Sequence, residues 1–245
     1  MNIESASIQG FLAKLSFKDR IERAHFKVTP DGIQCLVPDQ LHTMVTKCVM
    51  HQTLQTNAFE FTIADLRSFA EMIAKLKGTI SLDVSNGLIL LSDEKIAFEI
   101  DAIKDDDLAS FSDKFDFSKT NDSHIVFQMG SNIEYSKYIV FESEPMKEAI
   151  KTVKVVYDKF FFLNVNNRLL TLTAKNRAKK ASVKIPIIDA NVDAFDCPII
   201  DYIIDIAPKY DAIKLLFRTK DEPLLIYAYD SKYESHYYLA TRPND

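Results

Sequence analysis

Four stretches of the sequence carry apolar residues every three or four positions, which is the spacing of one helix face. In the second stretch, Leu66, Phe69 and Ile73 form this apolar stripe. Thr62 is predicted to be its N-cap and Gly78 its C-terminal stop. The pattern predicts four amphipathic helices, with the sequences SIQGFLAKLSFKD, TIADLRSFAEMIAKLKG, EPMKEAIKTVKVVYD and CPIIDYIIDIAPKYD.

A proline opens each of the last two stretches. Pro145 and Pro198 suit the first turn of a helix, because the amide hydrogen that proline lacks has no partner there. Pro208 is expected to end the fourth helix.

Most of the remaining chain consists of short runs rich in β-branched and aromatic residues, which are typical of strands. Two pairs of such runs are separated by turn-forming sequences, Pro30-Asp31-Gly32 and Asn166-Asn167. Each pair is predicted to be a β-hairpin. Further strands are expected after the second and the fourth helix.

The order of these elements occurs twice. The helices begin near residues 8, 62, 145 and 198, and the spacing within the first half recurs in the second to within one residue. This repetition predicts an α+β protein with a duplicated architecture of two domains. The expected domains are residues 1–103 and 135–245, joined by an acidic, serine-rich linker at 104–134 whose second part is strand-like.

Composition limits the compartment and the class of protein. The chain has 245 residues, 47% of them hydrophobic, and a formal net charge of −5, so contacts with nucleic acid would need an uneven distribution of charge. Its three cysteines, Cys35, Cys48 and Cys197, have no paired spacing, which favours a reducing intracellular setting. Neither a signal peptide nor a membrane-spanning segment is expected.

Motifs for catalysis are not found. The chain has only 5 glycines, no glycine-rich phosphate loop, and no nucleophile–base constellation. Its 5 histidines show no ligand spacing. We therefore expect no enzymatic activity, no cofactor and no metal site, although an enzyme with an unrecognised site remains an alternative.

Several segments resemble the DNA polymerase sliding clamp family, in particular the proliferating cell nuclear antigens. EPLLIYAYDSKYESHYYLA is similar to that family's ending, and IQCLVPDQLHTMV to the stretch that carries an Asp and a His, Asp39 and His42, after the first hairpin. EYSKYIVFESEPMKEAIKTV and PIIDYIIDIAP are similar to the start and the last helix of its second domain. The linker is longer and more acidic than is usual, and Thr241 replaces the usual proline.

The resemblance implies a ring, usually a homotrimer, with helices lining a central hole and antiparallel sheets outside. Such a ring encircles double-stranded DNA without reading its sequence, acts as a polymerase processivity factor, and tethers replication and repair enzymes. Its implied partners are DNA polymerase, clamp loader, nuclease and ligase, bound through short peptide motifs. The implied location is the nucleus in a eukaryote, or the cytoplasm in an archaeon or a viral host compartment.

Basic residues on the polar faces of the helices are the expected DNA contacts, since scattered positive charges bind phosphates independently of sequence. The alternative is that these side chains simply face solvent. The candidates are Lys14, Lys18, Arg20, Arg67, Lys75, Lys77, Lys147, Lys151, Lys154 and Lys209.

The resemblance also implies an apolar pocket for partner peptides. Its expected members are His42, Met44, Phe127, Met129, Ile133, Pro223, Tyr238, Ala240 and Thr241. Because strands alternate, one face of the last strand must instead be core.

The resemblance implies that the ring closes when strand edges of neighbouring subunits pair, at KIAFEIDAI and KKASVKIPI. The candidate interface residues are Ile96, Phe98, Ile100, Lys180, Ser182 and Lys184. Lysines that merely blunt an edge are the alternative reading of the second segment. A clamp-fold accessory factor, checkpoint-type or viral, that forms no homotrimeric ring is the alternative function.

Overall fold

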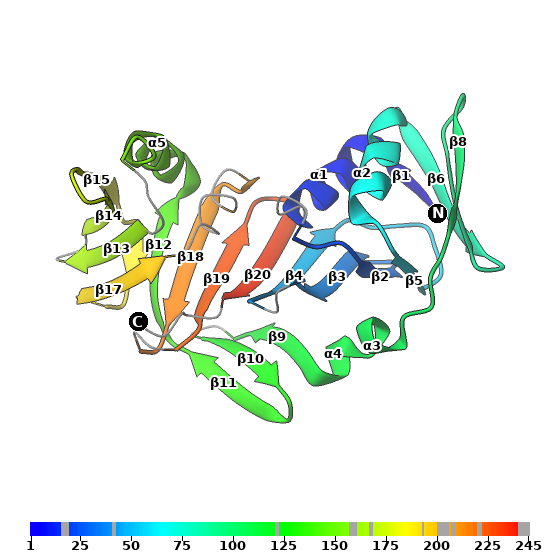
Figure 1. Ribbon diagram of the computed structural model, residues 1–245. Helices are drawn as coiled ribbons and strands as arrows, with labels where there is room; N and C mark the ends of the chain where they lie inside the picture. The colour runs from blue at the N-terminus through cyan, green and yellow to red at the C-terminus, as the bar shows by residue number, and fades with distance from the viewer. Residues whose placement is uncertain are drawn as a thin grey trace. The chain divides into compact units, whose positions relative to one another are not determined.

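The chain folds into two compact units in the computed structural model (Figure 1). The structure describes the residues up to 239, except 16–19, 41–42, 121–122, 157–160, 167–168, 193, 200–205, 207–208 and 220–221. Unit 1 comprises Met1–Phe117, Phe127–Asn132 and Ser231–Tyr237. Unit 2 comprises Ser118–Val126, Ile133–Asp230 and Tyr238–Asp245.

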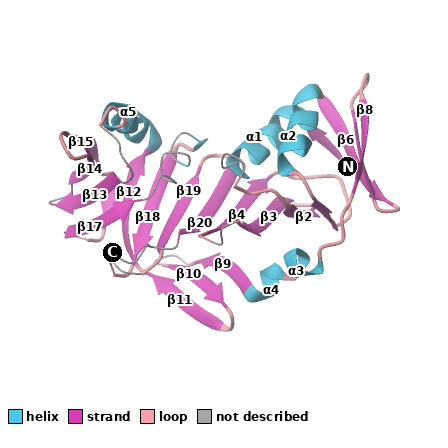
Figure 2. Ribbon diagram, in the orientation of Figure 1, coloured by secondary structure: helices cyan, strands magenta, loops and turns pink. Residues whose placement is uncertain are grey.

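Unit 1 is built mainly of antiparallel strands, with two helices that lie side by side (Figures 1 and 2). Its strands follow the spatial orders β1-β6-β7-β8 and β20-β4-β3-β2-β5. Its elements are β1 (Asn2–Glu4), α1 (Ser5–Leu15), β2 (Ala24–Thr29), β3 (Gly32–Pro38), β4 (Met44–His51), β5 (Phe59–Ile63), α2 (Leu66–Lys75), β6 (Thr79–Ser85), β7 (Leu88–Ser92), β8 (Ala97–Asp101), α3 (Asp106–Ala109), α4 (Phe111–Lys114) and most of β20 (Tyr233–Leu239).

Unit 2 repeats this plan with one described helix of comparable length. Its strands follow the orders β15-β14-β13-β17 and β16-β12-β18-β19. Its elements are β12 (Lys137–Glu142), α5 (Ser143–Val153), β13 (Phe161–Asn166), β14 (Leu169–Lys175), β15 (Lys180–Pro186), β16 (Asp189–Ala190), β17 (Ala194–Ile199), β18 (Ala212–Phe217) and β19 (Leu224–Tyr229).

The linker is more ordered than its composition suggests. After α3 and α4 it forms three strands, β9 (Phe115–Lys119), β10 (His124–Gln128) and β11 (Ser131–Tyr135), in the order β11-β10-β9. The strand expected at HIVFQM is β10. Asp105 explains the first short helix, because its side chain accepts the amide hydrogen of Leu108 at 3.0 Å.

The core of unit 1 is organised around Phe26 of β2. Its ring centroid lies 4.9 Å from that of Phe61, 5.9 Å from that of Phe69 and 6.2 Å from that of Phe11. All four rings are buried. Since Phe11 and Phe69 belong to α1 and α2, the cluster fixes both helices on the sheet, and each aromatic pair adds about 1 kcal/mol to simple burial.

The first predicted hairpin is present, with its turn between β2 and β3. Gly32 has a φ of +148°, and a Cβ added there would lie 1.9 Å from the carbonyl oxygen of Met50. Only glycine fits this close approach of two backbones. The second hairpin pairs β13 with β14, and its turn at 167–168 lies outside the described residues.

The N-cap of α2 is Asp65, so the prediction of Thr62 is wrong. Asp65 accepts hydrogen bonds from the amide and the hydroxyl of Ser68, at 2.9 and 2.6 Å, and these bonds lower the pKa of its carboxyl group. Thr62 instead belongs to β5, where its hydroxyl is 2.8 Å from Nδ1 of His25.

The predicted start of the fourth helix is also wrong. Pro198 lies in β17, opposite Phe162 of β13. Within sheets proline is largely confined to edge strands, and β17 is an edge strand. The rest of that predicted helix lies mostly in 200–205 and 207–208, outside the described residues.

The first part of β20 holds α1 in place. Tyr233 donates its hydroxyl to the carbonyl oxygen of Ser7 at 2.8 Å, and Tyr237 donates to that of Lys14 at 3.3 Å. Lys232 donates to the hydroxyl of Ser7. Residues far apart in the sequence therefore close unit 1.

We predict that Gly10→Ala destabilises the protein by about 1–2 kcal/mol, despite the better helix propensity of alanine. The new Cβ would lie 2.5 Å from the hydroxyl oxygen of Tyr233, which is anchored on Ser7. In a Tyr233→Phe background the cost should fall, because the clashing oxygen is gone. Urea denaturation of the four proteins measures this coupling, and an equal cost in both backgrounds would contradict the packing.

Candidate nucleic-acid and partner interfaces

Three lysines of α5 are the strongest predicted DNA contacts. Lys147 donates to Glu144 at 2.8 Å and Lys151 to Glu148 at 2.5 Å, one helical turn back in each case. The first bond lowers the pKa of Glu144, and the second raises that of Lys151. Lys154 forms the C-cap of the helix. Such exposed ion pairs are weak, so a phosphate can replace the glutamate partner at little cost.

The helical spacing predicts that Lys14 lies on the surface. This prediction is wrong, because the residue is only 7% exposed. Its ammonium group lies 4.9 Å from the centroid of the Tyr233 ring. This cation–π contact packs α1 against β20.

The cations of α2 are exposed at both ends of the helix. Arg67 donates through Nε to Glu71 at 3.1 Å. Lys75 is the last helical residue, and the amide of Lys77 donates to Asp93 at 2.9 Å.

The remaining basic candidates are less informative. Arg20 and Lys209 are half-buried. Lys18 lies outside the described residues.

The two predicted interface segments are both edge strands. In β8, Phe98 and Ile100 are half-buried on one face, whereas Glu99 and Asp101 are exposed on the other. Ile96, just before the strand, is 37% exposed. This edge therefore has an acidic face and a partly apolar face.

The edge strand β15 has the opposite charge. Lys180, Ser182 and Lys184 are exposed on one face, and Ala181 and Val183 are half-buried on the other. An outer strand leaves a row of backbone N–H and C=O groups without a ladder partner in the monomer.

Among the predicted pocket residues, Pro223 and Tyr238 meet in unit 2. Tyr135 donates its hydroxyl to the carbonyl oxygen of Pro223 at 3.0 Å and is hydrogen-bonded to Tyr238. Burial, followed by this neighbouring hydroxyl, raises the pKa of Tyr135, and burial also raises that of Tyr238. Sequence reasoning missed Tyr135 at this place, because a single tyrosine at the start of the second predicted domain has no characteristic pattern.

The other pocket candidates are spread over both units. Met44 and Phe127 belong to unit 1, the first buried and the second half-buried. Met129, also in unit 1, is 81% exposed at the β10–β11 turn, and Ile133 is half-buried in unit 2. His42, Ala240 and Thr241 lie outside the described residues.

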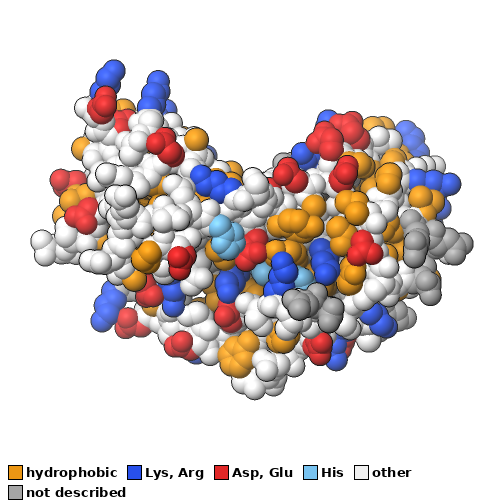
Figure 3. All heavy atoms as spheres, turned by 180° about the vertical axis from the view of Figure 1, so that it is seen from behind, with side chains coloured by type: hydrophobic (Ala, Val, Ile, Leu, Met, Phe, Trp, Pro, Cys, Tyr) orange, Lys and Arg blue, Asp and Glu red, His pale blue; other side chains and the backbone are white. Residues whose placement is uncertain are grey.

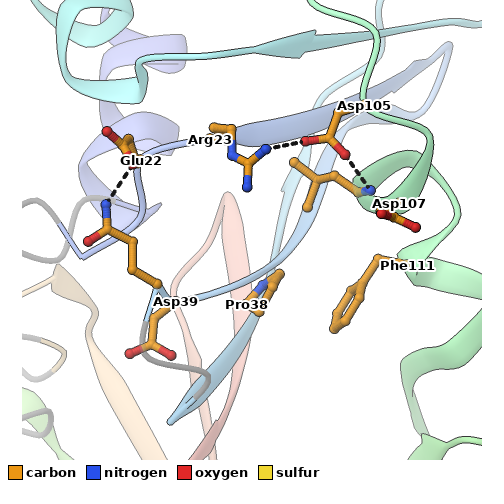
Figure 4. A pocket seen from close by; sticks show the side chains of 9 residues that line it. Glu22, Arg23, Pro38, Asp39, Asp105, Asp107 and Phe111 are labelled. Atoms are coloured by element: carbon orange, nitrogen blue, oxygen red, sulfur yellow. Dashed lines mark hydrogen bonds and ion pairs between the residues drawn. The ribbon is translucent and has the colours of Figure 1, made fainter.

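Unit 1 contains a cavity of about 310 Å³ that sequence reasoning missed (Figure 4). Arg23 points across it to Asp105, at 2.8 Å, and the ring of Phe111 forms part of its wall. Asp39 is buried there and accepts the amide hydrogens of Thr43 and Met44. The acidic run that begins at Asp105 was the available signal, but nothing in the run indicated its ionic partner.

His124 is a buried histidine whose pKa lies well below its usual value. It is 1% exposed, and its ring centroid lies 4.8 Å from that of Tyr227. Burial lowers its pKa to about 4, and the nearby charges of Lys214 and Lys119 add to this effect. The imidazole is therefore neutral at physiological pH.

Within the described residues, no group of three or more His, Cys, Asp or Glu side chains is arranged to hold a metal ion. No helix in the same part of the chain is long and apolar enough to cross a membrane. Acidic and basic side chains are intermixed on the face shown in Figure 3.

No protein-family model and no curated protein sequence matches the chain. Solved structures do match it. A. fulgidus PCNA, with the C-terminal region of FEN-1 bound, superposes with a TM-score of 0.75 over 100% of this chain and 98% of its own, at 10% identity. PCNA from Thermococcus kodakaraensis gives 0.73 over 98% of both chains, at 16% identity.

The chain has the sliding-clamp fold. The DNA polymerase sliding clamp from Pseudomonas aeruginosa also matches, with a TM-score of 0.72 over 100% of this chain and 66% of that one, at 10% identity. The predicted fold class and the resemblance to sliding clamps are thereby confirmed at the level of the fold.

The burial of His124 in this clamp fold predicts a loss of stability at mildly acidic pH. The unfolded histidine has a pKa of 6.5 and the folded one about 4, so the unfolded state binds the proton more tightly. The free energy of unfolding should be highest above pH 6.5 and fall by up to about 3 kcal/mol toward pH 4. Urea denaturation across this range should show a shallower slope for His124→Gln. His51→Gln is the matched control at an exposed site, and the same reduced slope in both variants would contradict the assignment.

Proposed function

We propose that the protein is a DNA sliding clamp that encircles duplex DNA and tethers replication and repair enzymes. The observation that carries this proposal is the match to PCNA structures over 98–100% of the chain. In this proposal residues 1–103 and 135–245 are the two clamp domains and 104–134 connects them. The protein acts as a scaffold and has no catalytic activity of its own.

Oppositely charged edges support closure into a ring. Because β8 and β15 are different strands, pairing one subunit's β8 with its neighbour's β15 is a head-to-tail contact, which closes into a ring when the rotation allows. The exposed Glu99 and Asp101 would then meet Lys180 and Lys184. Two β8 edges, or two β15 edges, would repel each other, so the charges favour the pairing of β8 with β15.

The exposed lysines of α5 and the basic ends of α2 support contact with DNA. Lys147 and Lys151 pair with glutamates of their own helix, so these two positive charges can turn toward phosphates at little cost. A clamp needs such mobile, sequence-independent contacts to slide.

Partner recognition is proposed at the surface that includes Tyr238 and Pro223. A. fulgidus PCNA binds the C-terminal region of FEN-1, which supports a peptide from a nuclease as one class of partner. Polymerase, ligase and clamp loader are further proposed partners. The alternative, a clamp-fold accessory factor without a homotrimeric ring, predicts a monomer or a dimer in solution.

We expect native mass spectrometry to give a mass of three chains of 28.0 kDa each. The variant Lys180→Glu/Lys184→Glu should be monomeric, because both edges are then acidic. Adding Glu99→Lys and Asp101→Lys to the same chain should restore the trimer, since the edges are again opposite in charge. Lys137→Glu, at an exposed position of β12, should leave assembly unchanged.

A wild-type protein that stays monomeric would overturn the ring. If the trimer survives the two lysine substitutions, the ring stands, but the charges of β8 and β15 do not hold it together.

If the protein encircles DNA, its retention on a linear duplex should depend on whether the ends of the duplex are blocked. At 0.5 M salt, the protein should stay on a linear duplex whose two ends are blocked by streptavidin, and should leave when one end is free, because contacts through charge alone are screened. Lys147→Gln, Lys151→Gln and Lys154→Gln together should shorten the dwell time on DNA with a free end at least tenfold at low salt, and should leave retention on blocked DNA unchanged. Equal retention on blocked and open DNA would contradict encirclement.

A further inference from the structure

One face of the unit 2 strands β12, β18 and β19 carries aromatic and basic side chains outside the proposed clamp contacts. Tyr227 lies directly opposite Lys214 in the ladder, and Lys214 lies opposite Val140. Because side chains alternate along strands, Tyr138 and Tyr229 share this face. The opposite face carries buried aliphatic residues such as Ile139 and Ile213.

Two lysines are held against the rings of this face. The ammonium group of Lys214 lies 3.9 Å from the centroid of the Tyr138 ring. That of Lys119 lies 4.9 Å from the centroid of Tyr227 and donates to its hydroxyl at 3.3 Å. Cation–π contacts leave the outer N–H bonds of an ammonium group available for another acceptor.

The positive charge of this surface is not neutralised by a direct ion pair. Within the described part of the chain, neither Lys119 nor Lys214 forms a salt bridge. Burial, followed by repulsion from Lys119, lowers the pKa of Lys214. The carboxylates on this face are Asp189, which accepts the Tyr138 hydroxyl at 2.9 Å, and Glu142, farther along β12.

We propose that this surface, made of Lys119, Lys214, Tyr138 and Tyr229, is a docking site for an acidic segment of a partner protein. Carboxylates complete the coordination of the two ammonium groups, and Tyr229, 37% exposed, offers an apolar edge beside them. The aromatic rings hold the lysines in place before binding, which lowers the entropic cost of the contact.

Single-stranded nucleic acid fits this surface less well than an acidic peptide. Base stacking needs an open ring face. Tyr227 is only 5% exposed, with Lys119, His124 and Tyr229 against its ring, and Lys214 already lies over Tyr138. The rings of Tyr138 and Tyr227 are therefore already covered, which favours anion binding over base stacking at this surface.

The test uses fluorescence anisotropy with the labelled peptide Glu-Asp-Glu-Asp-Phe-Glu-Asp-Glu. Its counterpart with Gln and Asn in place of the acids, and the 15-mer of thymidylate, serve as further probes. We expect wild type to bind the acidic peptide and Lys119→Gln/Lys214→Gln to bind it at least tenfold more weakly. Lys137→Gln removes an exposed lysine of β12, the strand of Tyr138, whose side chain alternates to the other face of the sheet, and this variant should bind like wild type.

Equal affinity of wild type and the double variant for the acidic peptide would overturn the proposal, as would tighter binding of the thymidylate oligonucleotide that depends on the same lysines. Circular dichroism establishes that the double variant is folded, and the single variant Lys119→Gln replaces it if it is not. Because the readout needs neither ring nor DNA, failure of the clamp function would leave this result unaffected.

Discussion

The antiparallel backbone ladder is the constraint on which the rest of this protein depends. Successive side chains of a strand point to opposite sides, so many of the described strands, such as β13, have one packed face and one open face. In β19 both faces are buried. The aromatic cluster around Phe26 occupies one packed face, and the surface of Tyr138 and Lys214 occupies an open one. A ladder also has to end somewhere, and its last strands decide what a subunit can pair with.

Sequence periodicity was sufficient for α1, α2 and α5, because the apolar stripes of these helices are long. It failed where local chemistry has two solutions. Thr62 and Asp65 are both good caps, and the pairing of Thr62 with His25 in the β2–β5 ladder leaves Asp65 to cap the helix. Pro198 suits a helix start and an edge strand equally, and the position of β17 in its sheet is a tertiary property.

The candidate sites were predicted less completely than the fold. Lysines on helices are visible in the sequence, but their partners are not. The structure shows that Lys14 packs on Tyr233, whereas the half-buried Lys147 and the exposed Lys151 pair with glutamates of their own helix. The cavity at Arg23 and the aromatic surface at Lys214 are formed by segments far apart in the sequence, so no local sequence pattern predicts them.

The assignment of Ser231–Tyr237 to unit 1 has a consequence for biosynthesis. A ribosome adds about 5–20 residues per second, and domains generally fold as they emerge. Unit 1, however, lacks β20 and its hydrogen bonds to α1 until residues 231–237 have been translated. Until then β4 has no neighbouring strand on that side, and such an unpaired strand edge can pair with other chains.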